Sequence, residues 1–191
     1  TLSLHDALPI YHSIRSFKGI YPKLGNRVYI DPAATVIGDV NLGDDVSVWP
    51  GAVIRGDLLS IVVGARSNIQ DNAVLHTTHA SDYNPEGFPL TIGEDVIIGH
   101  RAILHGCTLG SQVLVGSGAI INDGAVVKNG VIVGAGCLVP PRKTLESGFI
   151  YVGNPCKKLR PLSEQEQKFF RYSAASYIRL KDQYLAENTQ D

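Results

Sequence analysis

The sequence predicts an all-β fold, a parallel β-helix built from six-residue repeats and followed by one C-terminal α-helix. Two observations support this prediction. An aliphatic residue returns every six positions over most of the chain, with a small or β-branched residue four positions later, and a helical stripe of apolar residues follows near the C-terminus. The period is too short for a helical repeat or a propeller blade, whereas three short strands of six residues close one triangular coil.

The six-residue repeat is most regular between Thr91 and Val139. Its aliphatic positions there are Ile92, Ile98, Leu104, Leu109, Val115, Ile121, Val127 and Val133. An earlier stretch has the same period, with one slip of register, at Ile30, Val36, Leu42, Val48, Ile54, Val63, Ile69 and Leu75. We therefore expect the β-helix to occupy residues 28–140.

The segments that lack this period predict its boundaries. Residues 1–27 are expected to form a lead-in, of which residues 1–10 are expected to lie outside the fold and not to form a signal peptide. Residues 79–89 are polar, contain two prolines and a glycine, and predict a loop that leaves the coil. The Pro140-Pro141 pair is expected to stop the repeat, because proline cannot donate to a strand ladder. Residues 141–162 are then an extended connection.

A C-terminal helix is predicted over residues 163–188. Ser163 and Glu166 have the spacing of a capping box at its start. One helical face is then traced by Leu162, Phe169, Phe170, Ser173, Tyr177, Leu180 and Tyr184. A helix with such a stripe needs a surface to pack on, so we expect it to cover the side of a coil of its own or of a neighbouring subunit.

Composition limits the classes of function. With 17 basic and 18 acidic residues the net charge is -1, so we expect no binding to nucleic acid or to a membrane. No apolar run approaches the roughly 20 residues of a membrane span. Three cysteines without metal-like spacing indicate a reducing compartment, and we expect a cytoplasmic protein. The expected partners are small molecules and protein subunits.

Three histidines can be placed by counting hexads. With the loop removed, Leu75 and Leu104 occupy the same slot on consecutive coils, so His76 and His105 should be neighbours at the strand spacing of about 4.8 Å. Two imidazoles at that spacing can bind one metal ion. His100 projects from the preceding face of the triangle, and the residue in its column one coil earlier is Asp71.

Because His100 projects from another face, it cannot easily join the pair of its own coil. If three prisms pack side by side, it meets the histidine pair of a neighbouring subunit. This predicts a three-histidine site at a trimer interface with one open coordination position, which is the pattern of a catalytic metal. The alternative is that the histidines merely pack or form hydrogen bonds.

The repeat occurs together with several short motifs, which are HGC at His105–Cys107, RGD at Arg55–Asp57 and NIQD at Asn68–Asp71. With these motifs and the terminal helix, the chain resembles the γ-class carbonic anhydrases over about Tyr21–Leu185, above all their short bacterial members. The resemblance implies a left-handed β-helix assembled as a homotrimer with metals between subunits. The implied metal is zinc, or else iron or cobalt, bound by His76 and His105 of one subunit and His100 of the next.

The resemblance also implies roles for five polar residues. Arg55 and Asp71 match the interface ion pair of the family, and Asp57 matches an acid of the same network. Gln70 matches the polar residue beside the metal-bound water, and Asn68 supports it. The alternative for the charged residues is that they only hold the subunits together.

Some positions depart from the archaeal prototype of the family. Leu58 stands where the prototype has a glutamate, and residues 77–89 lack the long acidic insertion that carries a proton-shuttling glutamate. Glu86 is the only glutamate in this loop. Tyr172 and Tyr177 are candidates to reach the site from the helix. Because fast CO2 hydration must export a proton in each turnover, the expected enzyme is slow or inactive.

Three functions follow as alternatives. In the first, the metal lowers the pKa of its bound water to about 7, and the hydroxide attacks CO2 to give bicarbonate, a lyase reaction. The same hydroxide can attack the thioester of an acyl-CoA. In the second, a hexapeptide-repeat acyltransferase uses one histidine as general base and no metal. In the third, the protein is a non-enzymatic trimeric scaffold, and the metal only holds its subunits together.

Overall fold

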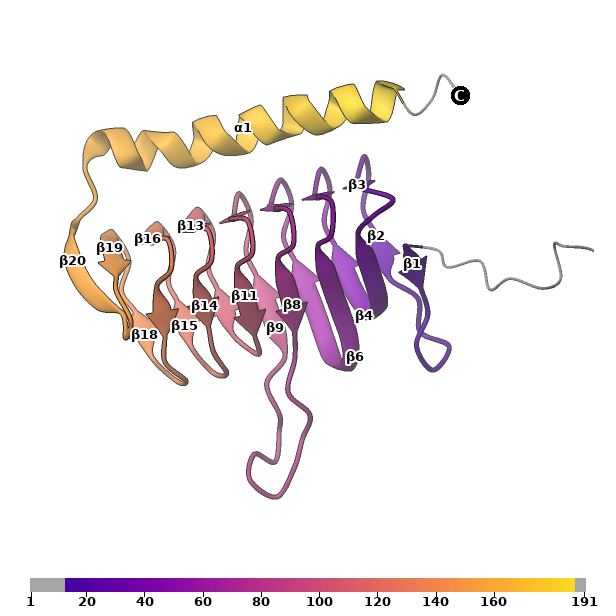
Figure 1. The fold of residues 1–191 in the computed structure, drawn as a ribbon, viewed down its shortest axis with the longest axis horizontal. Helices are drawn as coiled ribbons and strands as arrows, with labels where there is room; N and C mark the ends of the chain where they lie inside the picture. The colour runs from indigo at the N-terminus through magenta and orange to yellow at the C-terminus, as the bar shows by residue number, and fades with distance from the viewer. Residues whose placement is uncertain (1–12, 188–191) are drawn as a thin grey trace, which may run out of the picture.

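The computed structural model describes residues 13–187, which form a β-solenoid of about eight turns with one C-terminal helix. Short strands stack in parallel along the solenoid axis, and the helix runs along one side of it (Figure 1). The predicted fold class is confirmed. Residues 1–10, which were expected to lie outside the fold, are outside the described range.

The strands line three faces of the solenoid. The first face contains β4 (Thr35–Leu42), β6 (Val53–Val63), β8 (Val74–His76), β11 (Ile103–His105), β14 (Ile120–Ile121) and β17 (Leu138–Val139). The second face contains the distal parts of β4 and β6 with β9 (Leu90–Ile92), β12 (Thr108–Leu109), β15 (Val126–Val127) and β18 (Thr144–Leu145). The third face contains β3 (Tyr29–Ile30), β5 (Ser47–Val48), β7 (Asn68–Ile69), β10 (Ile97–Ile98), β13 (Val113–Val115), β16 (Val131–Val133), β19 (Phe149–Val152) and β20 (Lys157–Pro161).

The core is the interior of the solenoid, and the predicted aliphatic positions fill it. Leu75, Leu104 and Ile121 are fully buried and stack in register on β8, β11 and β14. The small residues four positions later, such as Ala102 and Ala119, are buried at the corners. The six-residue period therefore identifies the inward side chains of consecutive coils.

The expectation that Pro140-Pro141 stop the repeat is wrong. Beyond them, Thr144–Leu145 pair with Val126–Val127 of the preceding coil, and Leu145 is fully buried. The prolines are tolerated because β17 is the last strand of its row, so no further strand requires an N–H from Pro140. The corner is completed by Arg142, which has a φ of 60°.

The repeat also begins before the expected position. β1 (Ile14–Arg15) and β2 (Lys23–Leu24) lie in the segment expected to be a lead-in, and both pair in parallel with β4. Ile14 and Leu24 are ten positions apart, because a turn lies between the two strands, so this segment does not show the six-residue period. Between the two strands, residues 17–20 form a turn closed by backbone hydrogen bonds between Phe17 and Ile20.

The C-terminal helix α1 (Glu164–Glu187) covers the third face of its own solenoid (Figure 1). Its predicted capping box is present, because the backbone N–H of Glu166 donates to Ser163 Oγ at 3.2 Å and the carboxylate of Glu166 accepts the N–H of Ser163 at 2.8 Å. Near this end, Phe170 is 2% exposed and packs with Ile150 and Leu162. The helix therefore has its partner within the chain.

The far end of α1 is anchored by charge and by aromatic contacts. Lys181 is fully buried, and its Nζ lies 2.9 Å from Asp45 Oδ1. The ring of Tyr184 contacts the rings of Tyr29 and Trp49, with centroid distances of 5.4 and 5.3 Å. Because both ends are fixed, the middle of the helix is held against the third face.

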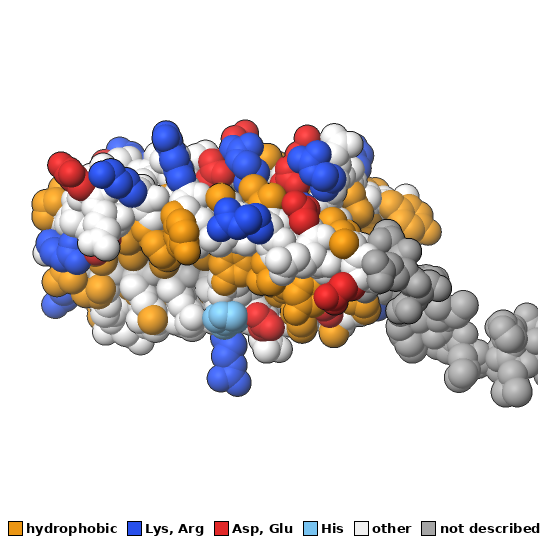
Figure 2. Space-filling model, turned by 90° about the horizontal axis from the view of Figure 1, so that it is seen from above, with side chains coloured by type: hydrophobic (Ala, Val, Ile, Leu, Met, Phe, Trp, Pro, Cys, Tyr) orange, Lys and Arg blue, Asp and Glu red, His pale blue; other side chains and the backbone are white. Residues whose placement is uncertain are grey.

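The surface carries mixed charges. Seen from the side of α1, Lys and Arg side chains alternate with Asp and Glu side chains (Figure 2). No helix within residues 13–187 combines the length and the apolar character needed to cross a membrane.

We predict that Phe170→Ala lowers the free energy of unfolding by about 3–5 kcal/mol, because it leaves a cavity between α1 and the third face. The matched control is Phe169→Ala, since Phe169 is 44% exposed and its loss leaves no buried cavity. Urea denaturation followed by circular dichroism measures both variants. Equal effects of the two substitutions would contradict the described packing of α1.

Candidate metal centre

His76 and His105 lie side by side at the ends of β8 and β11. The two strands pair in parallel with His76 directly opposite His105, as the hexad count predicts. His76 Nδ1 lies 3.1 Å from His105 Nε2, and the ring planes are tilted by 59°. One nitrogen of each imidazole therefore points at the other ring.

The outer nitrogen of each of these histidines is bound to a carboxylate. His76 Nε2 lies 3.0 Å from Asp57 Oδ1, and His105 Nδ1 lies 2.7 Å from Asp123 Oδ1. Asp57 is also bound by Arg55 at 2.6 Å. Partial burial acts to raise the pKa of Asp57, but the hydrogen bonds from Arg55 and His76 outweigh it and bring the pKa below its usual value. Asp57 is thus an ionised acceptor.

The carboxylates determine which imidazole nitrogens carry lone pairs. A carboxylate accepts a hydrogen bond from the N–H that faces it, so the opposite nitrogen of a neutral imidazole carries no proton. Both bare nitrogens of the pair then face each other at 3.1 Å. Burial lowers the pKa of His76, an effect that the hydrogen bond to Asp57 only partly offsets, so its neutral form is favoured.

Two lone pairs at this distance repel each other unless a cation lies between them. Two nitrogens bound to one tetrahedral zinc, each at 2.0 to 2.1 Å, are separated by about 3.3 Å. The separation of His76 Nδ1 and His105 Nε2 is close to that value. The donor set of this pair therefore fits two of the ligands of a divalent metal ion.

His100 stands apart from the pair. It follows β10 on the third face, and its Nδ1 lies 2.9 Å from Oδ2 of Asp71, the residue that the hexad count places in its column. The side chain of His100 is 53% exposed. Within residues 13–187 of one chain, no three His, Cys, Asp or Glu side chains are arranged to hold a metal ion.

Gln70 and Asn68 lie beneath the middle of α1. Gln70 Nε2 donates to Asn68 Oδ1 at 3.2 Å and to the hydroxyl of Tyr177 at 2.7 Å. Asn68 Nδ2 is buried and has no hydrogen-bond partner among the described residues. Gln70, His100 and Tyr177 line one hollow of about 280 Å³ between the third face and the helix. Tyr172 is 65% exposed.

Within one chain, the charged residues form ion pairs other than the pair that the family resemblance implies between subunits. Arg55 binds Asp57, and Asp71 binds His100. The ion pair between Arg55 and Asp71 therefore stays a prediction about the interface. The structure brings the eight predicted site residues together in two groups, one on the first face and one beside the third.

Sequence reasoning missed Asp123 and Thr78. Asp123 binds His105, and Thr78 Oγ1 donates to Asp123 Oδ2 at 2.8 Å. Part of the signal was present in the hexads, because Ile121 stacks on Leu104 and Asp123 follows at the next corner. One coil forward, the slot of His105 holds Asn122, so the hexad count leads to the neighbour of this carboxylate and not to Asp123 itself.

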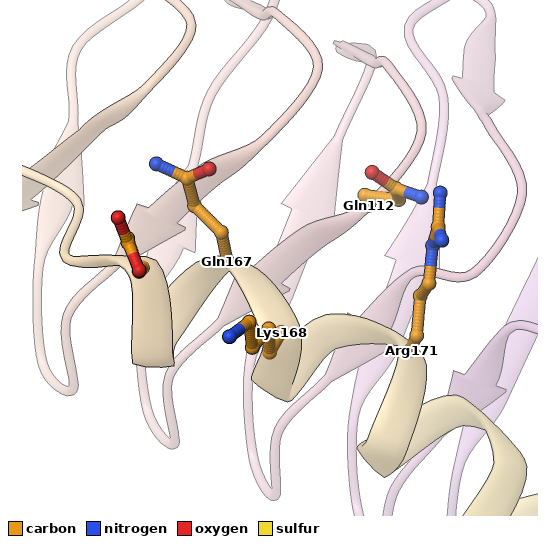
Figure 3. A pocket seen from close by; sticks show the side chains of 5 residues that line it. Gln112, Gln167, Lys168 and Arg171 are labelled. Carbon is orange, nitrogen blue, oxygen red and sulfur yellow. The ribbon is translucent and has the colours of Figure 1, made fainter.

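A further hollow of about 320 Å³ lies beside the first turns of α1. Its lining side chains Gln167, Lys168 and Arg171 come from the helix and Gln112 from the solenoid (Figure 3). None of the predicted site residues lines it. Its polar and flexible side chains are those of a solvated helix border, so it is separate from the histidine pair.

Comparisons with known proteins agree with this architecture. The family model "Bacterial transferase hexapeptide (six repeats)" matches residues 21–56. A crystal structure of a hexapeptide transferase family protein from Anaplasma phagocytophilum is 39% identical, with a TM-score of 0.83 over 90% of this chain and 97% of that chain.

Curated relatives extend over most of the chain. Protein YrdA of Escherichia coli is 55% identical over 93% of this chain and 96% of its own length. A probable carbonic anhydrase of Methanocaldococcus jannaschii is 42% identical over 83% of this chain and 96% of its own length. Mitochondrial gamma carbonic anhydrase 1 of Arabidopsis thaliana is 40% identical over 88% of this chain and 61% of its own length. The chain therefore belongs to the hexapeptide-repeat proteins as a homologue of YrdA, related to the γ-carbonic anhydrases.

Proposed function

We propose that this protein is a cytoplasmic γ-carbonic anhydrase-like metalloprotein that hydrates CO2 to bicarbonate. Its site contains His76 and His105 of one subunit and His100 of the next subunit in a homotrimer. The observation that carries this proposal is the pair of imidazole nitrogens that face each other at 3.1 Å, each on a ring whose other nitrogen faces a carboxylate. An arrangement of this kind favours a bound cation, and it has no use in an acyltransferase that needs a single histidine as base.

An apolar row on the first face supports the trimer. Its outward side chains stack in register and are Val53, Val74, Ile103, Ile120 and Leu138. Val74 and Ile103, which lie beside the histidine pair, are 36% and 38% exposed. A continuous, partly exposed apolar row is typical of a subunit interface, and burial of this row would bring a neighbouring chain to the histidines.

The protein contributes orientation and hydrogen bonding to the proposed reaction. A zinc ion bound by the three histidines supplies the Lewis acidity that lowers the pKa of water to about 7, and iron or cobalt would serve the same donor set. Gln70 has its Nε2 committed to Asn68 and Tyr177. Its Oε1 is left as the acceptor that can orient a water molecule in the shared hollow.

Proton export is the step that limits the rate of the proposed reaction. Leu58 is 44% exposed and cannot carry a proton. Glu86 lies exposed on the protruding loop, and no hydrogen bond joins it to the histidine pair within the described residues. The proposed activity is therefore slow compared with an enzyme that has a dedicated shuttle.

We predict that His105→Ala reduces metal-dependent CO2 hydration to the background rate, because it removes one of two paired ligands. The protein is purified without oxygen, loaded separately with zinc, iron and cobalt, and assayed by stopped flow. His79→Ala is the matched control, since His79 lies exposed on the loop and should leave turnover unchanged.

Absence of CO2 hydration by wild-type protein with any of these metals bound would contradict the proposed reaction. The same samples are then assayed for acyl-CoA hydrolysis. Thioester hydrolysis that His105→Ala abolishes would identify a metal-dependent thioesterase. Loss of stability on chelation without either turnover would identify a metal-pinned scaffold.

We predict that Ile103→Glu dissociates the trimer, because a carboxylate in the apolar row would be buried without a partner. Val126→Glu is the matched control, since Val126 is 37% exposed on the second face, away from the proposed interface. Sedimentation equilibrium gives the mass of each variant. A trimeric Ile103→Glu protein, or a wild-type monomer, would show that the first face is not the interface.

A further inference from the structure

We propose that Asp123 is a positioning residue that fixes the tautomer of His105, and that Thr78 holds Asp123 in place from the base of the protruding loop. This inference rests on the proposed function, since it concerns how the histidine pair is prepared for a metal ion. It assigns a role to two residues that the short motifs of the sequence do not include.

The distances around His105 define its tautomer. Its Nδ1 lies 2.7 Å from Asp123 Oδ1, whereas its Nε2 faces His76 at 3.1 Å. With the proton held on Nδ1, the lone pair of Nε2 points to the space between the rings. Without Asp123, an aqueous imidazole carries its proton on either nitrogen, and a proton on Nε2 would block that position.

Both carboxylate oxygens of Asp123 are used. Oδ2 accepts the hydroxyl of Thr78 at 2.8 Å while Oδ1 faces His105. Among the described residues, His105 is the only ion-pair partner of Asp123, whereas Asp57 also binds Arg55. The charge of Asp123 is therefore not shared with an arginine or lysine of the described residues, and its Oδ1 is available to the N–H of His105.

Gly106 leaves the space in which Asp123 reaches His105. Its φ is 50°, and a Cβ added there would lie 2.5 Å from Asp123 Oδ1 and 2.6 Å from Cβ of Phe88. Any larger residue would push the carboxylate away from the imidazole. The glycine of the HGC motif thus has a physical explanation in the approach of this carboxylate.

Thr78 connects this arrangement to the loop. Its backbone exchanges two hydrogen bonds with Phe88, at 2.8 and 3.1 Å, which close the base of the loop that projects from the solenoid (Figure 1). The hydroxyl of the same residue holds Asp123. A displacement of the loop base would therefore be transmitted to the orientation of His105.

The first test measures the tautomer of His105 in the metal-free protein. Histidine is labelled with 15N, and the ring nitrogen shifts of the full chain are recorded at neutral pH for wild type, Asp123→Ala and Asp123→Asn. We expect the wild type to carry the proton on Nδ1 and Asp123→Ala to show a mixture of tautomers. Asp123→Asn should keep the wild-type tautomer, because its amide oxygen still accepts the N–H and its amide nitrogen can donate to Thr78.

The second test measures affinity for cobalt and zinc by competition with a chromophoric chelator. We expect Asp123→Ala to bind about 10- to 100-fold more weakly, the usual effect of losing the outer partner of a metal-binding histidine. Asp123→Asn keeps the hydrogen bond but lacks the charge, so its affinity for metal should lie between those of the wild type and Asp123→Ala. Thr78→Val should weaken binding less than Asp123→Ala, because the carboxylate remains.

Asp44→Ala is the matched control, since Asp44 is an exposed corner aspartate that binds Asn26 elsewhere on the solenoid.

The outcomes separate this inference from the proposed function. An Asp123→Ala protein that is folded, keeps the wild-type tautomer and binds cobalt with wild-type affinity would overturn the role of Asp123. If Asp123→Ala is unfolded, the metal affinities of Asp123→Asn and Thr78→Val are the test. Wild-type affinity for metal in both variants would also overturn the role of Asp123. A wild-type protein that binds none of the metals would overturn the proposed function, while the tautomer of the metal-free protein would still decide the role of Asp123.

Discussion

The in-register stacking of parallel coils is the constraint on which the rest of this structure depends. Each residue lies directly above the residue of the same slot one coil away, as Leu104 does above Leu75. Buried slots therefore form continuous aliphatic columns, and polar slots form columns of neighbouring polar groups. The same rule that builds the core brings His76 beside His105 and His100 beside Asp71.

Each of the three histidines binds a carboxylate of an adjacent coil, and for His100 the stacking register itself places Asp71 in the same slot. Asp57, Asp71 and Asp123 each lie one coil from the histidine that they bind. The result on the first face is a row of polar side chains in which Arg55 and His76 bind Asp57, His105 binds Asp123, and the two imidazoles face each other. Hydrogen bonds of this kind would hold the two imidazoles in place for the proposed metal ion.

Much of this arrangement could be predicted from the sequence because the six-residue period converts position in the chain directly into position in space. The inward column, the contact of His76 with His105 and the capping box at Ser163 all follow from counting. The continuation past Pro140-Pro141 did not follow, because the tolerance of proline depends on β17 being an edge strand, which is a property of the whole sheet. The lead-in strands were missed because the turn at residues 17–20 separates them, so their spacing does not match the six-residue period.

Asp123 was overlooked for a different reason. The hexad count places Asn122 in the slot of His105, and the contact with Asp123 depends on the rotamers of Asp123 and Thr78 and on the missing side chain of Gly106. The position of His100 relative to the histidine pair likewise cannot be predicted from one chain, because His100 lies on another face than His76 and His105. Family resemblance supplied that part of the hypothesis, and the apolar row on the first face gives it a physical basis.

The central claim is that two subunits share one site, and the most direct measurement is complementation between two inactive variants. His105→Ala and His100→Ala are unfolded together, mixed in equal amounts, refolded and assayed for bound zinc. Each variant alone should bind no zinc at the site, whereas random mixed trimers should recover about a quarter of the wild-type sites, because one in four ordered neighbour pairs has all three histidines. Failure of the mixture to recover zinc, although the wild type refolds and binds it, would contradict a site shared between subunits.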